Sequence, residues 1–454
     1  MELIRTISGI RGIVNKNFNE SIASDYAKSF CSLQKKGPII LARDTRNRGL
    51  EILNKIAASI ASLGRDVYDC GIIPTPVIQF LVTELNASGG IMITASHNPE
   101  EWNGMKFIDK DGCFINSEKN ANLLYNFDNN TFPKASTNKG EIVDKNHTKD
   151  LFIDKLFDLK CLNIERIKNR QFEVVIDCIN GANYSILPDV LEKLNCKVTR
   201  VFCDDSGVFN RGAEPIPENL DLLKNKVIET NSDLGLASDP DGDRLSIVDN
   251  KGNSIGEENT LVLCANHYYD ETNSKAPLVT NLSSTMSLDD IASNHDIPLY
   301  RSAVGEANVI ELMKEYSSEI GGEGNGGVIL NELHLGRDSL VASIMILNKL
   351  SKTDKSLNEI MQNIPQYSMI KDKIKASSQI NLDILYDFLI KEYDSISYDK
   401  KDGLKLIWHD KWIHIRSSNT EPIIRIIAES KTSQETNLLI EQTKSNINKF
   451  LIED

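Results

Sequence analysis

Short apolar runs alternate with amphipathic helical segments near the start of the chain, and this alternation restricts the possible folds more than any other feature. Ile39–Ala42 predicts a buried strand, and the helix that follows carries apolar residues at positions 52, 56, 60 and 63 before it ends at Gly64. Two further segments, Val67–Cys70 and Gly90–Ile93, predict the next strands. Strands that alternate with helices form doubly wound sheets. We therefore expect an α/β fold.

The chain contains 454 residues, which is too long for a single hydrophobic core. Residues 120–149 are polar, rich in Asn and weakly periodic, so we place a domain boundary at their end. The strand–helix alternation resumes in two later segments, and the last segment of the chain differs from them. These observations predict three α/β units followed by a smaller domain, with the ranges 1–150, 151–255, 256–368 and 369–454.

Composition limits the classes of function. The formal net charge of −14 argues against a nucleic-acid partner and against binding to an anionic membrane surface. No segment has the length and apolarity of a membrane span, and no signal peptide is recognisable, so we expect a cytoplasmic protein. The eight cysteines are scattered without a CxxC pair, which argues against structural zinc and against a disulfide framework.

A polar loop, Thr94–Pro99, follows the apolar run that ends at Ile93. Open α/β sheets present their reactive groups at the carboxyl ends of strands, and Ser96 lies there beside His97. A strand that ends in an ordinary polar turn would explain the same residues. Lys106 follows where the next strand is expected, although a single lysine is most often a surface residue.

Three carboxylates alternate along one loop, at Asp239, Asp241 and Asp243. Negative charges so close together repel one another unless a cation binds them, and oxygen ligands alone favour Mg²⁺, Mn²⁺ or Ca²⁺. The loop is not an EF-hand, because Arg244 occupies the position of the required glycine and Asn250 that of the closing glutamate. The alternative to a metal site is a solvated acidic turn.

Gly321–Gly327 contains the pattern GxGxxG, but an apolar strand follows it where a dinucleotide site requires a helix. We therefore reject a nucleotide site. Glu323 and Asn325 suit the recognition of hydroxyl groups, because the glycines allow the backbone to approach a ligand closely. A plain flexible turn is the alternative.

A further polar loop lies between two alternating segments of the last domain. Arg416–Thr420 offers a guanidinium, three hydroxyls and an amide, and Arg425 follows on the next strand. These groups suit phosphate binding through paired Arg hydrogen bonds and backbone donors. A polar hairpin loop would have a similar composition.

Five loops together resemble those of the α-D-phosphohexomutase superfamily, and they occur in the order of that family over essentially the whole chain. They are Ser8–Val14 with Arg11, Thr94–Pro99, Asp239–Arg244, Gly322–Gly327 and Arg416–Pro422. The resemblance implies three doubly wound mixed α/β domains around a central cleft, and a smaller C-terminal α+β domain of the TATA-box-binding-protein type.

The resemblance also implies a reaction, the reversible transfer of a phosphoryl group between C6 and C1 of a hexose phosphate. Ser96 would carry the group as phosphoserine, and a hexose 1,6-bisphosphate would be the intermediate and activator. Mg²⁺ would be bound by a phosphoserine oxygen and by Asp239, Asp241 and Asp243. The implied partner is a small-molecule hexose phosphate, and the enzyme would be a monomer or a homodimer.

Further roles are implied by matching this chain to the family residue by residue. The acid–base and charge-stabilising roles would fall to Lys106, Arg11, Arg244 and His97. The ring hydroxyls of the sugar would be bound by Glu323 and Asn325. The phosphate that does not react would be bound by Arg416, Ser418, Asn419, Thr420 and Arg425.

The sugar loop departs from many bacterial members, which have Ser and His where this chain has Asn325 and Gly327. A proton-transfer role for that His, as in some members, is therefore not carried over. With Gly336–Asp338 after it, and with Thr420–Pro422 and Arg425, this loop is most similar to phosphoglucosamine mutases of archaeal type and their bacterial relatives. This similarity favours conversion of glucosamine 6-phosphate to glucosamine 1-phosphate. The alternatives are a phosphoglucomutase/phosphomannomutase and, more remotely, a metal-dependent sugar phosphatase or an inactive sugar-phosphate sensor.

Overall fold

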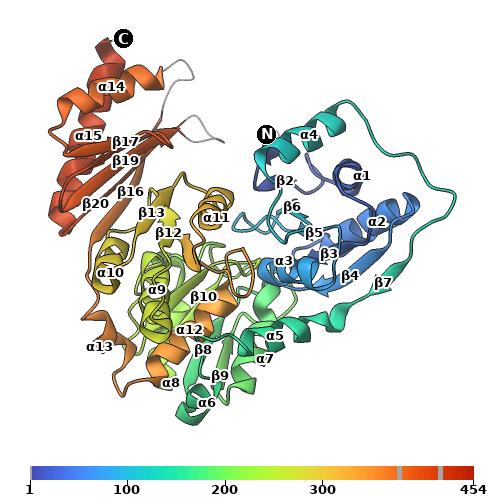
Figure 1. Cartoon of the computed structure of the whole chain (residues 1–454), viewed down its shortest axis with the longest axis horizontal. Helices are drawn as coiled ribbons and strands as arrows, with labels where there is room; N and C mark the ends of the chain where they lie inside the picture. The colour runs from blue at the N-terminus through green and yellow to red at the C-terminus, as the bar shows by residue number, and fades with distance from the viewer. Residues whose placement is uncertain (1–2, 376–380, 418–422, 454) are drawn as a thin grey trace. The chain divides into compact units, whose positions relative to one another are not determined.

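The computed structural model describes residues 3–375, 381–417 and 423–453 (Figure 1). Two compact units divide the chain. The first comprises Met1–Ser274 with Glu319–Met361, and the second comprises Lys275–Ser318 with Gln362–Asp454. Across the described ranges, no helix is both long enough and apolar enough to cross a membrane.

The first unit begins with a seven-stranded sheet, in which the strand–helix alternation predicted from the sequence is confirmed. Its strands lie in the order β1-β2-β6-β5-β3-β4-β7. Their bounds are β1 (Ile4–Thr6), β2 (Gly9–Ile13), β3 (Ile39–Arg43), β4 (Val67–Ile72), β5 (Gly89–Ile93), β6 (Trp102–Asp109) and β7 (Ile142–Asp144). β3 runs parallel to β4 and β5, whereas β6 runs antiparallel to β5 and β2. The sheet is therefore mixed.

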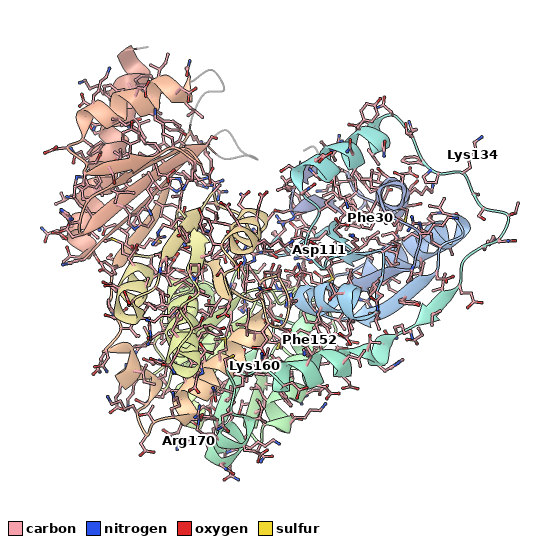
Figure 2. All side chains as sticks on the ribbon, viewed as in Figure 1. Phe30, Asp111, Lys134, Phe152, Lys160 and Arg170 are labelled. Carbon is pink, nitrogen blue, oxygen red and sulfur yellow. The ribbon has the colours of Figure 1, made fainter. Side chains whose placement is uncertain are left out.

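Helices cover both faces of this sheet, namely α1 (Glu20–Leu33), α2 (Gly49–Ser62), α3 (Thr75–Glu84) and α4 (Ser117–Asp128). A side chain at Gly89 would meet Phe30 of α1 (labelled in Figure 2), whereas one at Gly90 would meet Val82 of α3. Because neighbouring residues of a strand point to opposite faces, α1 and α3 lie on opposite sides of β5. Every residue of β5 is buried, as expected of a central strand covered on both faces.

Local sequence explains where several helices begin. The side chain of Asn19 accepts hydrogen bonds from the backbone N–H groups of Ser21 and Ile22 at the start of α1. Pro76 lies in the first turn of α3, where its missing N–H is not needed. The apolar residues of α2 at positions 52, 56 and 60 pack into the core beneath the sheet. Capping and helical periodicity therefore place these helices.

A second sheet in the first unit has the strand order β11-β10-β8-β9. Its strands are β8 (Glu173–Asp177), β9 (Lys197–Val201), β10 (Leu234–Ser238) and β11 (Leu245–Asp249). β8 is parallel to β9 and β10, while β11 is antiparallel to β10. The surrounding helices are α5 (Lys149–Phe157), α6 (Ile164–Arg170), α7 (Ile186–Lys193) and α8 (Asp221–Thr230), with short 3₁₀ turns η1 (Asn146–Thr148), η2 (Ala182–Tyr184) and η3 (Pro217–Asn219).

The first unit also contains an antiparallel pair with a glycine-rich turn, β14 (Ile320–Glu323) and β15 (Gly327–Leu330). The helices near it in sequence are α9 (Glu258–Thr272), α12 (Ser339–Ser351) and α13 (Leu357–Met361). Both α9 and α12 contact this pair of strands. The turn is therefore anchored on packed secondary structure.

The second unit joins two parts of the chain. Its first part holds the parallel strands β12 (Leu278–Asn281) and β13 (Leu299–Ser302) with helices α10 (Ser287–His295) and α11 (Glu306–Glu315). Its second part is an antiparallel sheet in the order β16-β20-β19-β18-β17. The bounds are β16 (Ser368–Lys375), β17 (Ser397–Asp399), β18 (Leu404–Ile407), β19 (Lys411–Ser417), β20 (Ile423–Ser430), α14 (Leu382–Glu392) and α15 (Ser433–Glu453). These two helices and the sheet share one apolar core, which confirms the predicted α+β domain at the C-terminal end.

Candidate active site

Ser96 lies in the loop that follows β5, at the carboxyl end of that strand, as the sequence predicts. Its backbone N–H donates to Oγ1 of Thr94 over 2.8 Å. Its φ of 49° is in the left-handed region, which residues other than glycine rarely adopt. The side chain is buried, and its Oγ lies 3.5 Å from Nδ1 of His97. The loop therefore holds one hydroxyl in an unusual and solvent-poor position.

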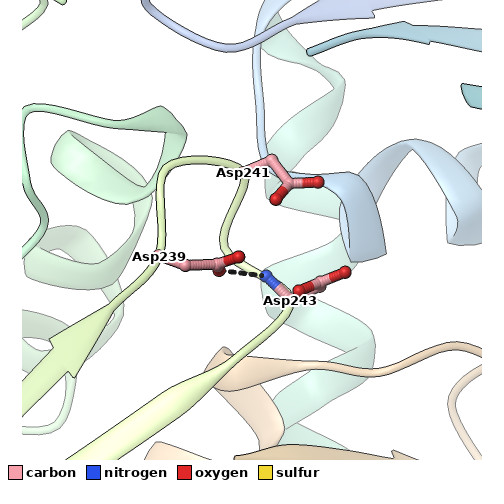
Figure 3. Close-up of side chains that lie close together, drawn as sticks. All are labelled: Asp239, Asp241 and Asp243. Carbon is pink, nitrogen blue, oxygen red and sulfur yellow. Dashed lines mark hydrogen bonds between the residues drawn. The ribbon is translucent and has the colours of Figure 1, made fainter. Parts of the chain in front are cut away.

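The three aspartates predicted to act together lie in the loop between β10 and β11 (Figure 3). All three side chains are buried, and their ligand atoms lie within 4.8 Å of one another. Oδ1 of Asp239 accepts hydrogen bonds from the backbone N–H groups of Asp243 and Arg244, over 3.1 and 3.2 Å. Gly242, with a φ of 72°, supplies the left-handed turn that folds the loop back on itself.

The acidic cluster has the features of a site for a divalent cation. Three of its buried oxygens, Oδ2 of Asp239, Oδ1 of Asp241 and Oδ1 of Asp243, accept no hydrogen bond from any residue that the structure describes. A buried polar atom without a partner costs free energy, and carboxylate oxygens are the ligands that Mg²⁺ prefers. Burial and the charges of Asp243 and Asp241 raise the pKa of Asp239 well above its usual value. A bound cation would relieve this repulsion, so the residues present fit the metal.

Lys106 is buried in β6, which contradicts the alternative that it is an ordinary surface residue. Its Nζ lies 2.6 Å from Oδ2 of Asp241 and 3.2 Å from Oδ2 of Asp243. Burial alone would lower the pKa of this amine, but the charges of the two carboxylates raise it. Lys106 is therefore a protonated side chain in direct contact with the acidic cluster.

Two guanidinium groups adjoin the Ser96 loop. Nη1 of Arg11, on β2, donates to Oδ1 of Asn98 over 3.0 Å, and Nη2 of Arg244 lies 3.2 Å from Nδ1 of His97. Burial, together with the positive charges of Arg244 and Arg11, lowers the pKa of His97 to about 2. His97 is therefore neutral and its Nδ1 can accept the hydrogen bond from Arg244. Two cations in contact with the loop of a buried serine suit an anionic group on its Oγ.

The glycine-rich turn is joined to the acidic cluster by a residue to which the sequence analysis assigns no role in the site. Nη1 of Arg337 donates to Oε2 of Glu323, and its Nη2 donates to Oδ2 of Asp243, both over 2.7 Å. Asn325 donates to the same glutamate oxygen over 3.4 Å. One guanidinium thus fixes the carboxylate predicted to bind a sugar relative to the predicted metal ligands. The sequence feature that could have indicated a role for Arg337 is its position directly before Asp338, the N-cap residue of α12.

The remaining predicted residues belong to the second unit. Arg416 on β19 and Arg425 on β20 are directly opposite each other in the register of the antiparallel pair. Nη1 of Arg416 lies 3.5 Å from Oδ2 of Asp402. Like charges that face each other across strands are unfavourable unless an anion binds between them. Ser418, Asn419 and Thr420 lie outside the described residues.

Comparison with protein families gives four consecutive matches along the chain. Phosphoglucomutase/phosphomannomutase alpha/beta/alpha domain I matches residues 3–134, domain II matches 150–252, domain III matches 257–367, and the C-terminal domain matches 354–444. Together these matches cover most of the chain in the order expected from the five loops.

Similar proteins span almost the full chain. A phosphoglucomutase/phosphomannomutase of Thermococcus kodakarensis is 34% identical and covers 95% of this chain and 96% of its own. A phosphoglucosamine/phosphogalactosamine mutase of Sulfurisphaera tokodaii is 30% identical, with coverage of 96% and 97%. The crystal structure of a phosphoglucomutase/phosphomannomutase family protein from Burkholderia thailandensis has the same fold, with a TM-score of 0.86, 22% identity and 98% of each chain covered.

Proposed function

The chain belongs to the phosphoglucomutase/phosphomannomutase family and is a phosphohexose mutase, and we propose that it moves a phosphoryl group between O6 and O1 of a hexose phosphate with Ser96 as the carrier. The observation that supports this most directly is the buried acidic cluster, which contacts Lys106. Three of its other carboxylate oxygens have no hydrogen-bond partner among the described residues. Arg244, adjoining that cluster in sequence, reaches the histidine next to Ser96.

In the first half of the proposed reaction, the bond between phosphorus and Oγ of phosphorylated Ser96 breaks as a bond forms to the free hydroxyl of the sugar. Protonated Lys106 would donate a proton to Oγ of Ser96 as the bond to phosphorus breaks, and would take up the proton that the sugar hydroxyl loses. The product of this half is a hexose 1,6-bisphosphate. The bisphosphate then reorients end over end in the site. Its other phosphoryl group is transferred to Ser96, and the proton moves in the opposite direction.

Charge compensation is the main requirement of phosphoryl transfer. Asp239, Asp241 and Asp243 would hold Mg²⁺, which when bound neutralises part of the charge on the transferring group. Arg11 and Arg244 would stabilise the anionic group on the serine from the protein side. These roles agree with the contacts of Arg11 and Arg244 with the Ser96 loop and of Lys106 with the acidic cluster.

The carrier role is tested with Ser96→Ala and a matched control, Ser238→Ala. Ser238 is a buried serine at the end of β10, and its Oγ has no hydrogen-bond partner among the described residues. With hexose 1,6-bisphosphate labelled in its phosphates, we expect wild type and Ser238→Ala to take up one label and to isomerise hexose phosphates. Ser96→Ala should take up none and lose turnover while it still binds substrate. Isomerisation by Ser96→Ala at the wild-type rate would exclude the carrier mechanism.

The sugar is proposed to be glucosamine 6-phosphate, converted to glucosamine 1-phosphate. Relatives from Sulfurisphaera tokodaii and Methanococcus aeolicus, each 30% identical, carry names of phosphoglucosamine mutases. Glu323 is suited to read an amino sugar, because a carboxylate held in place by Arg337 can accept from an ammonium group. The second candidate is a glucose or mannose phosphate, since the Thermococcus kodakarensis relative is named for those activities.

The two candidates are separated by kcat/KM for glucosamine 6-phosphate, glucose 1-phosphate and mannose 1-phosphate, measured with Mg²⁺ and a trace of hexose 1,6-bisphosphate. We expect preference for the amino sugar, and we expect Glu323→Gln to reduce kcat/KM for it more than for the neutral sugars. Preference of the wild-type enzyme for glucose or mannose would reject the amino-sugar assignment. Release of inorganic phosphate without isomerisation would instead indicate a phosphatase.

A further inference from the structure

Arg46 is one of the largest fully buried side chains of the protein, and it lies just after β3 beside the Ser96 loop. Its Nε donates to Oδ2 of Asp44 over 2.9 Å, and its backbone N–H donates to Oδ1 of the same residue over 3.1 Å. The side chains of both residues have no exposed surface. This buried pair is not among the groups that the proposed reaction uses.

The two terminal nitrogens of Arg46 bind the backbone of the Ser96 loop. Nη2 donates to the carbonyl oxygen of Asn98 over 2.7 Å, and Nη1 donates to that of Trp102 over 3.1 Å. The same two nitrogens also donate to the carbonyl oxygens of Ser96 and Pro99. A guanidinium has five N–H donors, so the bond to Asp44 and these four bonds account for all of them.

A second chain of hydrogen bonds reaches Ser96 from its other side. Oδ2 of Asp44 accepts from Oγ1 of Thr94 over 2.6 Å, and Oγ1 of Thr94 accepts from the backbone N–H of Ser96 over 2.8 Å. The N–H and the carbonyl of Ser96 are therefore both held by the pair of Arg46 and Asp44. This restraint is needed because a left-handed conformation is unfavourable for a residue other than glycine.

The guanidinium is also covered by a later part of the chain. The ring of Phe209 lies 4.8 Å from Cζ of Arg46, and the backbone N–H of Phe209 donates to Oε2 of Glu100 over 3.0 Å. Glu100 lies between Pro99 and Trp102, two of the residues whose carbonyl oxygens Arg46 binds. The contact shields the hydrogen bonds from water, where they would otherwise be weaker.

We propose that Arg46 is a positioning residue for phosphoryl transfer, which acts by fixing the backbone of residues 96–102 so that Oγ of Ser96 has one orientation. This inference rests on the proposed carrier role of Ser96. Arg46 itself makes no contact with the transferring group, because all its donors bind Asp44 and the loop. Lysine cannot replace it, since an ammonium has three donors and cannot span four carbonyls.

The test compares Arg46→Lys with Arg65→Lys. Arg65 is a matched control, because it also caps backbone carbonyls of the same domain, those of Cys31, Gln34 and Lys35, but none in the Ser96 loop. For each variant we would measure Tm, kcat, KM, and the single-turnover rate of label transfer from hexose 1,6-bisphosphate to Ser96. Both variants should lower Tm, since both lose hydrogen bonds to backbone carbonyls.

We expect Arg46→Lys to lower kcat and the rate of label transfer by about 100-fold, the size of effect that a displacement of about 1 Å produces, with little change in KM. Arg65→Lys should leave both rates close to wild type. If Arg46→Lys changes the rates no more than Arg65→Lys does at a similar Tm, the residue is structural only and the proposal is wrong. Failure of the wild-type enzyme to take up label would instead reject the carrier role of Ser96.

A second variant keeps the proposal testable if Arg46→Lys does not fold. Thr94→Val has nearly the shape of the original side chain but removes the hydroxyl that links Asp44 to the N–H of Ser96. It should slow label transfer without raising KM, and by less than Arg46→Lys because the four carbonyl bonds remain. An unchanged rate of transfer in a folded Thr94→Val protein would contradict the proposal.

Discussion

Asp239 carries the least compensated charge of the acidic cluster. Lys106 contacts Asp241 and Asp243, and Arg337 contacts Asp243, whereas no described residue forms an ion pair with Asp239. Asp239→Asn removes one of three buried negative charges and keeps an oxygen that can accept from the two backbone N–H groups. We therefore expect this variant to have a higher Tm than wild type in EDTA. We also expect it to lose the increase in Tm that Mg²⁺ gives the wild-type protein.

The control for this prediction is Asp177→Asn. Asp177 is also a buried aspartate of the first unit, but it is paired with Arg211 over 2.8 Å. Removing one partner of a buried pair costs roughly 3–5 kcal/mol, so this variant should have a lower Tm in EDTA and should still respond to Mg²⁺. A lower Tm for Asp239→Asn in EDTA, or an undiminished response to Mg²⁺, would contradict the assignment of the cluster as a cation site.

A site residue could be predicted from the sequence where the residues it acts with are close to it along the chain. Asp239, Asp241 and Asp243 share one loop, so their spacing alone indicated a cluster, and the structure brings them together. Buried Lys106 contacts Asp241, which is more than 130 positions later in the chain. The hydrogen bond from Arg337 to Asp243 joins residues 94 positions apart. No local pattern contains such contacts. The resemblance to a family supplied a role for Lys106 but none for Arg337.

At the scale of secondary structure, Gly104 on β6 allows this strand to approach β2 and the end of β5 closely. It faces Arg11 in the register with β2, and its carbonyl oxygen accepts from the N–H of Thr94 over 3.1 Å. A Cβ at this position would overlap the carbonyl oxygen of Ile10 and would lie 2.9 Å from that of Thr94. Backbone atoms cannot move aside as a flexible side chain can.

Gly104→Ala should therefore cost more than the roughly 1–3 kcal/mol typical of overpacking, and it should also lower kcat because it displaces Arg11. The control is Gly90→Ala on β5, where a Cβ would meet side-chain atoms of Val82 and Ile78. That variant should lose stability but keep kcat close to wild type, as measured by urea unfolding and steady-state kinetics. Equal losses of kcat in the two variants would show that the position of Arg11 does not depend on Gly104.

The strands and helices of the first unit could be predicted because each depends on its own residues. The run through β5 is apolar throughout, and α2 repeats its apolar residues with helical spacing. The grouping of residues 275–318 with the C-terminal sheet could not be predicted in this way. It depends on contacts such as Nζ of Lys405 to the carbonyl of Leu282 over 2.6 Å, between residues 123 positions apart. The predicted ranges of the four domains remain a prediction.

At the scale of the whole molecule, each compact unit contains a buried neutral histidine, and this makes the protein sensitive to acid. Burial lowers the pKa of His414, in the second unit, to about 4, and that of His267, in the first unit, to about 3. In the unfolded chain a histidine binds a proton near pH 6.5. The unfolded state therefore gains protons first as the pH falls, and the folded state loses stability relative to it.

His414, whose Nδ1 lies 2.8 Å from Oγ of Ser283, stabilises the folded state in a defined pH range. Its contribution to the free energy of unfolding is fully present above about pH 6.5, falls as the pH decreases toward about 4, and amounts to roughly 3 kcal/mol when lost.

His414→Gln keeps a polar side chain that cannot be protonated in this range. Hydrogen exchange at several pH values should show that this variant makes the second unit less sensitive to acid, whereas the first unit stays as sensitive as in wild type. The matching variant His267→Gln should have the reverse effect, and an equal change in both units from either variant would mean that the two units do not unfold separately.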